Sequence, residues 1–200
     1  MEIERKYDAD DATALPDWSA LPGVARVGAP EHRELDARYL DTPDGALASA
    51  LTALRRRTGG PDEGWHVKRS LAAGKHETRW PLGPAAGDDE AIEVPGPVAA
   101  ELAEIASPPF AEIARIRNSR TAYALIDAQG ALVAEFVDDR VTAADLRRGV
   151  ETRWREWELE LGPAAPADPA PLFAAADALV LAAGGRVSAS GSKLGRALGH

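Results

Sequence analysis

Three glutamates alternate in the segment WREWELEL, which covers residues 154–161. Side chains two residues apart project from the same face of a strand, so Glu156, Glu158 and Glu160 share one face. Trp157, Leu159 and Leu161 form an apolar stripe on the opposite face. Neighbouring carboxylates repel one another, and folding alone gives no reason to gather them. Because carboxylate oxygens are preferred ligands of Mg²⁺ and Mn²⁺, this segment indicates a divalent metal site.

The first residues of the chain, MEIERKY, repeat this alternation. Glu2, Glu4 and Lys6 project together, while the intervening side chains project to the other side. A solvated strand face or a protective row of charges on an edge strand is the ordinary interpretation of such a segment taken alone. The glutamates near the end of the chain favour a shared site instead.

Basic residues occur in several other segments with strand-like alternation. Arginine and lysine bind phosphate oxygens, arginine often through two parallel hydrogen bonds. We therefore expect a polyanion to contact some of these residues, although a single arginine such as Arg120 is also explained by a surface ion pair. The candidates for phosphate binding are Lys6, Arg55, Arg57, Lys68, Arg120 and Lys193.

The segment LVAEFVDD adds Glu135 and Asp139, which share a face, whereas Asp138 projects to the other. Charges of both signs are costly to bury unless they are paired, hydrated or bound to ions. A polyphosphate with Mg²⁺ or Mn²⁺ would satisfy both kinds of residue. The alternative is a barrel in which these charges form surface ion pairs.

The charged segments belong to eight stretches with the alternation of antiparallel strands, separated by turn signals. We expect charged faces to line the inside of an eight-stranded antiparallel β-barrel of the α+β class, with helices packed outside. The expected helices follow Thr42 and cover residues 97–106 and 169–184. The expected strands cover residues 2–7, 32–40, 51–58, 64–71, 76–82, 113–127, 131–139 and 151–161.

Composition limits the class of protein. The 200 residues suit a single domain spanning 1–200, and the formal net charge of −9 argues against a nucleic-acid-binding surface. No apolar run is long enough to cross a membrane, and no cysteine is present for a disulfide. We expect a cytoplasmic protein, monomeric or homodimeric, that contacts neither membranes nor nucleic acid.

The order of these motifs resembles the CYTH, or triphosphate tunnel metalloenzyme, superfamily. Residues 2–6, EIERK, resemble its ExExK signature, and YLDTPDGAL followed by RRR resembles its Y-x-D-T-x-x-x-x-L stretch and R-x-R strand. The resemblance continues through Lys68, Arg120, WELEL and Lys193 and covers nearly the whole chain. The family's R-x-E pattern is matched only by Glu77, and the His-Phe pair that precedes ExExK in its cyclase branch is missing.

The resemblance implies a triphosphate bound lengthwise in a tunnel. The six basic candidates named above would then bind its phosphates. The residues implied to act in catalysis are Glu2, Glu4, Lys6, Glu158 and Glu160. Those implied to hold one or two metal ions are Glu2, Glu4, Glu135, Asp139, Glu156, Glu158 and Glu160.

The activity that follows from the resemblance is metal-dependent hydrolysis of a triphosphate. Inorganic tripolyphosphate is favoured because no specific pocket for a base or for thiamine is visible, although thiamine triphosphate and nucleoside triphosphates also fit. Water is the expected nucleophile, polarised by the metal. The alternatives are a binding module for polyphosphate or nucleotides that lacks turnover, and a class IV-type adenylate cyclase.

Overall fold

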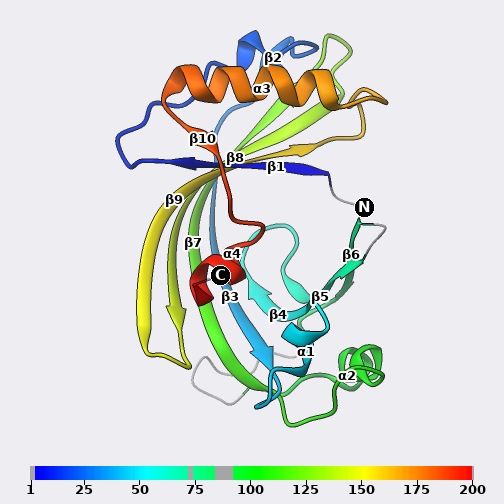
Figure 1. Cartoon of the computed structure of the whole chain (residues 1–200). Coiled ribbons are helices and arrows are strands. Elements are labelled where there is room, and N and C mark those ends of the chain that lie inside the picture. Colours follow the sequence, from blue (N-terminus) through cyan, green and yellow to red (C-terminus); the bar gives the residue numbers. More distant parts are fainter. Residues whose placement is uncertain (1–2, 72–73, 84–91, 200) are drawn as a thin grey trace.

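One strongly curved antiparallel sheet dominates the structure (Figure 1). The computed structural model describes residues 3–71, 74–83 and 92–199. The sheet has ten strands, and nine of them follow the order β10-β1-β9-β8-β7-β3-β4-β5-β6, while the short β2 pairs with β7. The three longest strands, β7, β8 and β9, lie next to one another and form the back of the curved sheet. Among the described helices, none is long and apolar enough to cross a bilayer.

The predicted α+β class with an antiparallel sheet is confirmed, with two differences in detail. The sheet contains ten strands rather than eight, and within the described residues β6 and β10 are its two unpaired ends, so hydrogen bonds do not close the barrel. The strands are β1 (Glu4–Ala9), β2 (Arg26–Val27), β3 (Glu31–Asp41), β4 (Thr52–Thr58), β5 (Gly64–Leu71), β6 (Gly74–Trp80), β7 (Ala111–Ile126), β8 (Leu132–Asp145), β9 (Val150–Leu161) and β10 (Arg186–Val187).

The helices divide between the outer and inner faces of the sheet. Helix α3 (Ala170–Ala183) covers the outer face, where Phe173 and Val180 pack with Trp157 in one core. The short α1 (Ala46–Ser49) and α2 (Gly96–Leu102) share a second core with residues of β3, β4 and β5. A 3₁₀ turn, η1, covers Trp18–Ala20. These positions agree with the expected helices outside the sheet.

Helix α4 (Lys193–Leu198) was not predicted from the sequence, and it lies on the concave face of the sheet (Figure 1). Leu194, Ala197 and Leu198 pack there against a group of inward-facing apolar residues that includes Ile116 and Val141. Their spacing of three and four residues is the helical signal that could have revealed this element. The helix carries its first residue, Lys193, into the interior of the curved sheet.

The turn between β3 and β4 is stabilised by a buried carboxylate. Asp41 is 1% exposed, and its Oδ1 accepts hydrogen bonds from the backbone N–H of Thr42 at 2.7 Å and of Leu47 at 2.9 Å. Its Oδ2 accepts from the backbone N–H of Ala48 at 3.1 Å. These bonds satisfy N–H groups at the start of α1 that the helix itself leaves unpaired. The D-T pair of the sequence motif therefore has a structural role, because it fixes the turn that leads into β4.

We expect Asp41→Ala to lower the free energy of unfolding by about 2 kcal/mol, because it leaves several buried N–H groups without an acceptor. Asp44→Ala is the matched control, since Asp44 is an exposed aspartate in the same turn, and we expect it to cost less than half as much. Urea unfolding followed by circular dichroism measures both changes. Equal losses in the two variants would contradict this role of Asp41.

Candidate functional site

Three buried carboxylates converge on the inner face of β8 and β9. Asp139 lies opposite Glu156 in the strand register, and Glu158 is the next inward residue of β9. One oxygen from each of the three lies within 4.8 Å of the others. Their exposed fractions are 0%, 4% and 8% for Asp139, Glu156 and Glu158. This group, here called the acidic trio, is the set of hard oxygen ligands that a divalent cation prefers.

The ammonium group of Lys193 lies inside the acidic trio. Its Nζ is 2.9 Å from Asp139, 2.6 Å from Glu156 and 2.8 Å from Glu158. Burial alone would lower the pKa of Lys193, but Asp139, Glu158 and Glu156 outweigh burial and raise it. In this structure a protein cation thus neutralises the carboxylates that could hold a metal ion.

Two further cations contact Glu158. The ammonium group of Lys6 on β1 forms an ion pair with Glu158 Oε1, and Arg120 Nη2 on β7 is 3.0 Å from Oε2. Arg120 also donates two hydrogen bonds to Asp139, at 2.8 and 2.7 Å. Burial would raise the pKa of Glu158, but Lys193, Lys6 and Arg120 hold it well below its ordinary value. The carboxylate is therefore ionised at neutral pH and available as a ligand.

The remaining predicted metal ligands lie around this group. Glu4 lies opposite Glu160, and Glu160 lies opposite Glu135. These three form a second acidic row, two residues beyond Glu158 on β9. Glu135 is bound at 3.0 and 3.2 Å by the guanidinium of Arg33. Glu2 lies outside the described residues. Metal binding by this second row stays a prediction.

The basic residues predicted on β4 lie on the same concave face, across the interior from β9. Arg55 Nη1 donates a hydrogen bond of 3.4 Å to the hydroxyl of Tyr39, and Arg57 forms an ion pair with Asp62. The Nε–H groups of both arginines are buried without a hydrogen-bond partner. A buried N–H without an acceptor costs about 1–3 kcal/mol, so both arginines are suited to an anionic ligand.

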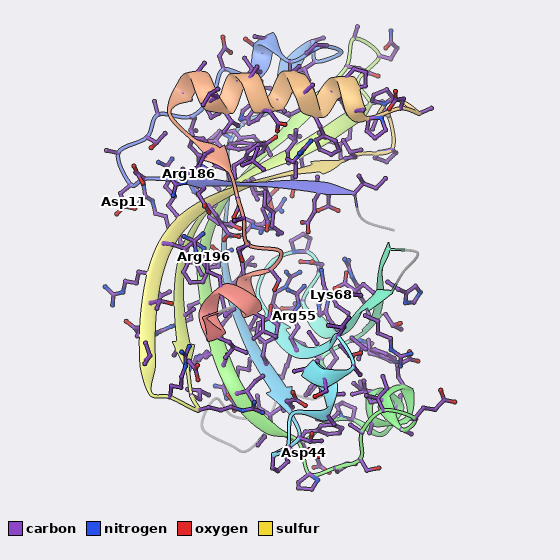
Figure 2. All side chains as sticks on the ribbon, viewed as in Figure 1. Asp11, Asp44, Arg55, Lys68, Arg186 and Arg196 are labelled. Carbon is purple, nitrogen blue, oxygen red and sulfur yellow. The ribbon has the colours of Figure 1, made fainter. Side chains whose placement is uncertain are left out.

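The charges on β5 and β6 surround a single carboxylate. Glu77 Oε1 is 3.3 Å from Lys68 Nζ, 3.5 Å from Arg55 Nη2 and 2.7 Å from His66 Nδ1. Its Oε2 is 2.6 Å from Arg79 Nη2. We call Arg55, Arg57, His66 and Lys68 the basic wall, and Figure 2 labels Arg55 and Lys68 on β4 and β5. Glu77 is the carboxylate that Arg55, His66 and Lys68 share, as Lys193 is the cation that the acidic trio shares.

The cations of the basic wall shift the pKa of Arg57 within the wall and of Tyr39 beside it. Burial lowers the pKa of Arg57 to about 9, with the help of Arg55 and Arg120. Burial would raise the pKa of Tyr39, but Arg55, Lys68 and Lys193 outweigh it and lower that pKa. The interior on this side therefore has a surplus of positive charge.

Besides His66 of the basic wall, the inward-facing residues not predicted as site residues include Arg33, Asn118 and Tyr39. Arg33 shares one strand face with Leu35 and Ala37, and a cation beside these apolar residues was the available signal. Asn118 is two residues before Arg120 on the same face and is 5% exposed, and its Oδ1 is buried without a hydrogen-bond partner. Tyr39 belongs to a recognised motif, but the motif alone does not show that its hydroxyl contacts Arg55.

The sequence profile of the CYTH domain matches residues 1–180. The chain belongs to the CYTH family. Two proteins of Mycobacterium tuberculosis, Rv2226 of strain H37Rv and MT2285 of strain CDC 1551, are each 39% identical to it over 211 residues. Their names, "Uncharacterized protein Rv2226" and "Uncharacterized protein MT2285", state no activity. The match covers 100% of this CYTH chain and 40% of each relative, so the chain spans about two fifths of their length.

Solved structures share the fold of this CYTH chain at low sequence identity. A candidate adenylate cyclase of Bacillus halodurans matches with a TM-score of 0.63 at 18% identity, covering 98% of this chain and 96% of that one. HpAC1 of Hippeastrum, a candidate adenylyl cyclase described as having a dominant triphosphatase activity, matches with a TM-score of 0.60 at 18% identity, covering 97% and 93%. At these identities the likeness establishes the fold.

A separate hollow of about 420 Å³ lies beside the turn that follows β3, and Pro43, Ile105 and Pro109 are among the residues that line it. None of the predicted site residues lines it. No lysine or arginine is among its lining residues, so it offers no cation to a polyphosphate. We therefore place the candidate site of the CYTH chain at the two charged groups and not at this hollow.

We expect Lys193→Met to increase the affinity for Mn²⁺ by about tenfold, because it removes the repulsion between the Lys193 ammonium group and the metal ion. A repulsion of only ~1.4 kcal/mol corresponds to that factor. Calorimetric titration with Mn²⁺ measures it. Lys68→Met is the matched control, since Lys68 contacts Glu77 rather than the acidic trio, and its Mn²⁺ affinity should stay as in the wild type. Unchanged affinity in Lys193→Met would contradict the assignment of the trio.

Proposed function

We propose that this CYTH chain binds a triphosphate together with a divalent metal ion and hydrolyses its terminal phosphoanhydride bond. Inorganic tripolyphosphate is the favoured substrate. The observation that carries the proposal is the division of one concave face into an acidic trio around Lys193 and a basic wall around Glu77. A metal ion and a polyphosphate replace those two internal counter-ions.

The acidic trio fits Mg²⁺ or Mn²⁺ because its donors are three ionised, buried carboxylates. Asp139, Glu156 and Glu158 would hold the ion, and Glu4, Glu135 and Glu160 of the second acidic row are candidates for additional ligands. When bound, the ion supplies neutralisation of phosphate charge and polarisation of water. Lys193, whose ammonium group contacts all three carboxylates, would then be available to bind phosphate oxygens.

The basic wall fits the phosphates. Arg55 and Arg57 present buried N–H groups that lack acceptors, and Lys68 adds an ammonium group beside them. These cations neutralise the charge that develops on the leaving diphosphate during hydrolysis. Lys6 and Arg120, which contact Glu158, orient the terminal phosphate toward the acidic side. Burial of most of these groups strengthens each interaction by lowering the local dielectric constant.

The proposal predicts phosphate release from tripolyphosphate that requires Mg²⁺ or Mn²⁺ and stops in chelator, with little release from pyrophosphate. Glu158→Gln should lower the rate at least about 100-fold, because it removes a charge that binds metal and positions Lys6 and Arg120. Parallel assays with ATP and thiamine triphosphate identify the preferred substrate. Formation of cyclic AMP from ATP would instead support the cyclase alternative.

Two neighbouring arginines provide the control for this experiment. Arg55→Met removes a cation of the basic wall, whereas Arg56→Met removes a cation that the strand alternation places on the opposite face. Only the first should weaken tripolyphosphate turnover. Tight binding of tripolyphosphate without turnover in any metal would overturn hydrolysis and favour a binding module, and equal effects of the two arginine variants would contradict the basic wall.

A further inference from the structure

His66 lies between two hydrogen-bond acceptors. Its ring is fully buried on β5, with Nε2 3.0 Å from the carbonyl oxygen of Asp62 and Nδ1 2.7 Å from Oε1 of Glu77. A carbonyl oxygen only accepts, so Nε2 carries a hydrogen, and an ionised carboxylate also only accepts. The contact at Nδ1 therefore requires a second proton, held either by the imidazolium of His66 or by a neutral Glu77. The two residues share this proton.

The groups that face this pair are mostly cations. From β4, Arg55 Nη2 lies 3.5 Å from both His66 Nδ1 and Glu77 Oε1, and Arg57 acts on His66 at longer range. From β5 and β6, Lys68 and Arg79 contact Glu77. Positive charge around a protonated pair favours loss of its proton.

The pKa of His66 is lowered in agreement with this geometry. Burial has the largest effect, and Arg55 and Arg57 act in the same direction, whereas the hydrogen bond to Glu77 opposes them. The shared proton is consequently held weakly while no anion lies against the basic wall. A ligand that brings negative charge to Arg55 and Lys68 would reverse this effect and favour the protonated pair.

We infer that His66 and Glu77 form a positioning pair that takes up a proton when a triphosphate binds to Arg55 and Lys68. This inference rests on the proposed function, since it uses the basic wall as the phosphate site. With the proton bound, the pair is neutral as a whole and places no net negative charge beside the arriving phosphates. Without the proton, the pair carries one negative charge that repels them.

The inference gives binding a pH dependence of defined sign. Because the bound state holds more protons than the free state, affinity for the triphosphate falls as pH rises through the pKa of the free pair. For uptake of one full proton the fall reaches about tenfold per pH unit. Below that pKa the free pair already holds its proton, and this contribution disappears.

The experiment is calorimetric titration of the full chain with tripolyphosphate, in chelator to prevent turnover, in buffers of different ionisation enthalpy. The dependence of the heat on the buffer gives the number of protons taken up. His66→Asn keeps an amide N–H beside Glu77 but does not titrate. His76→Asn is the matched control, because His76 is an exposed histidine on the neighbouring strand β6.

We expect the wild type and His76→Asn to take up the same fraction of a proton, and His66→Asn to bind tripolyphosphate with that uptake lost. Protonation of the ligand itself is common to all three and cancels in the comparison. Equal proton uptake in His66→Asn would overturn the inference while leaving the proposed function intact. Absence of tripolyphosphate binding to the wild type, both in chelator and with Ca²⁺ present, would overturn the proposed function and the inference with it.

A second measurement follows the titration of His66 itself in the wild-type chain and so does not depend on the folding of His66→Asn. The chain has four histidines, and the three others are assigned in NMR spectra by replacing each with asparagine. The titration midpoint of the fourth, His66, should move to higher pH when tripolyphosphate is added. An unchanged midpoint in the presence of saturating ligand would overturn the inference.

Discussion

Three carboxylates buried within 4.8 Å of one another repel strongly, and the ammonium group of Lys193 offsets that repulsion. Lys193 reaches them because α4 enters the concave side of the sheet and packs its apolar side chains there. Removal of one partner from a buried ion cluster leaves an uncompensated charge, so the position of α4 and the arrangement of the charges depend on each other.

The opposite side of the interior follows the same principle with the signs reversed. Glu77 contacts Arg55, Lys68, His66 and Arg79, and it keeps these basic groups together. Without a ligand, Glu77 supplies negative charge to the basic wall and Lys193 supplies positive charge to the acidic trio. A polyphosphate and a divalent metal ion carry the same two kinds of charge. The ligand we propose would therefore exchange with internal ion pairs, so binding requires side chains to move rather than an empty tunnel to be filled.

Much of this arrangement was predictable, because strand alternation fixes which side chains share a face. Alternation placed Glu156 with Glu158 and Glu4 with Lys6, each pair on one face of its own strand, whereas the pairing of β1 with β9 depends on strand order. The long strands fell close to their expected positions, except that β8 continues to Asp145 instead of ending at residue 139. The short α4, with glycines beside and within it, gave a weak helical signal. The contact of Arg33 with Glu135 and that of Glu77 with His66 depend on strand order and side-chain direction, which periodicity does not determine.

The most direct test of the account is a crystal structure of the wild-type chain with tripolyphosphate and Ca²⁺, in which anomalous scattering locates the metal. The account predicts the ion among Asp139, Glu156 and Glu158, the phosphates against Arg55 and Arg57, and Lys193 withdrawn from the acidic trio to the phosphates. A metal ion bound elsewhere, with Lys193 still inside the trio and phosphates away from both arginines, would contradict it.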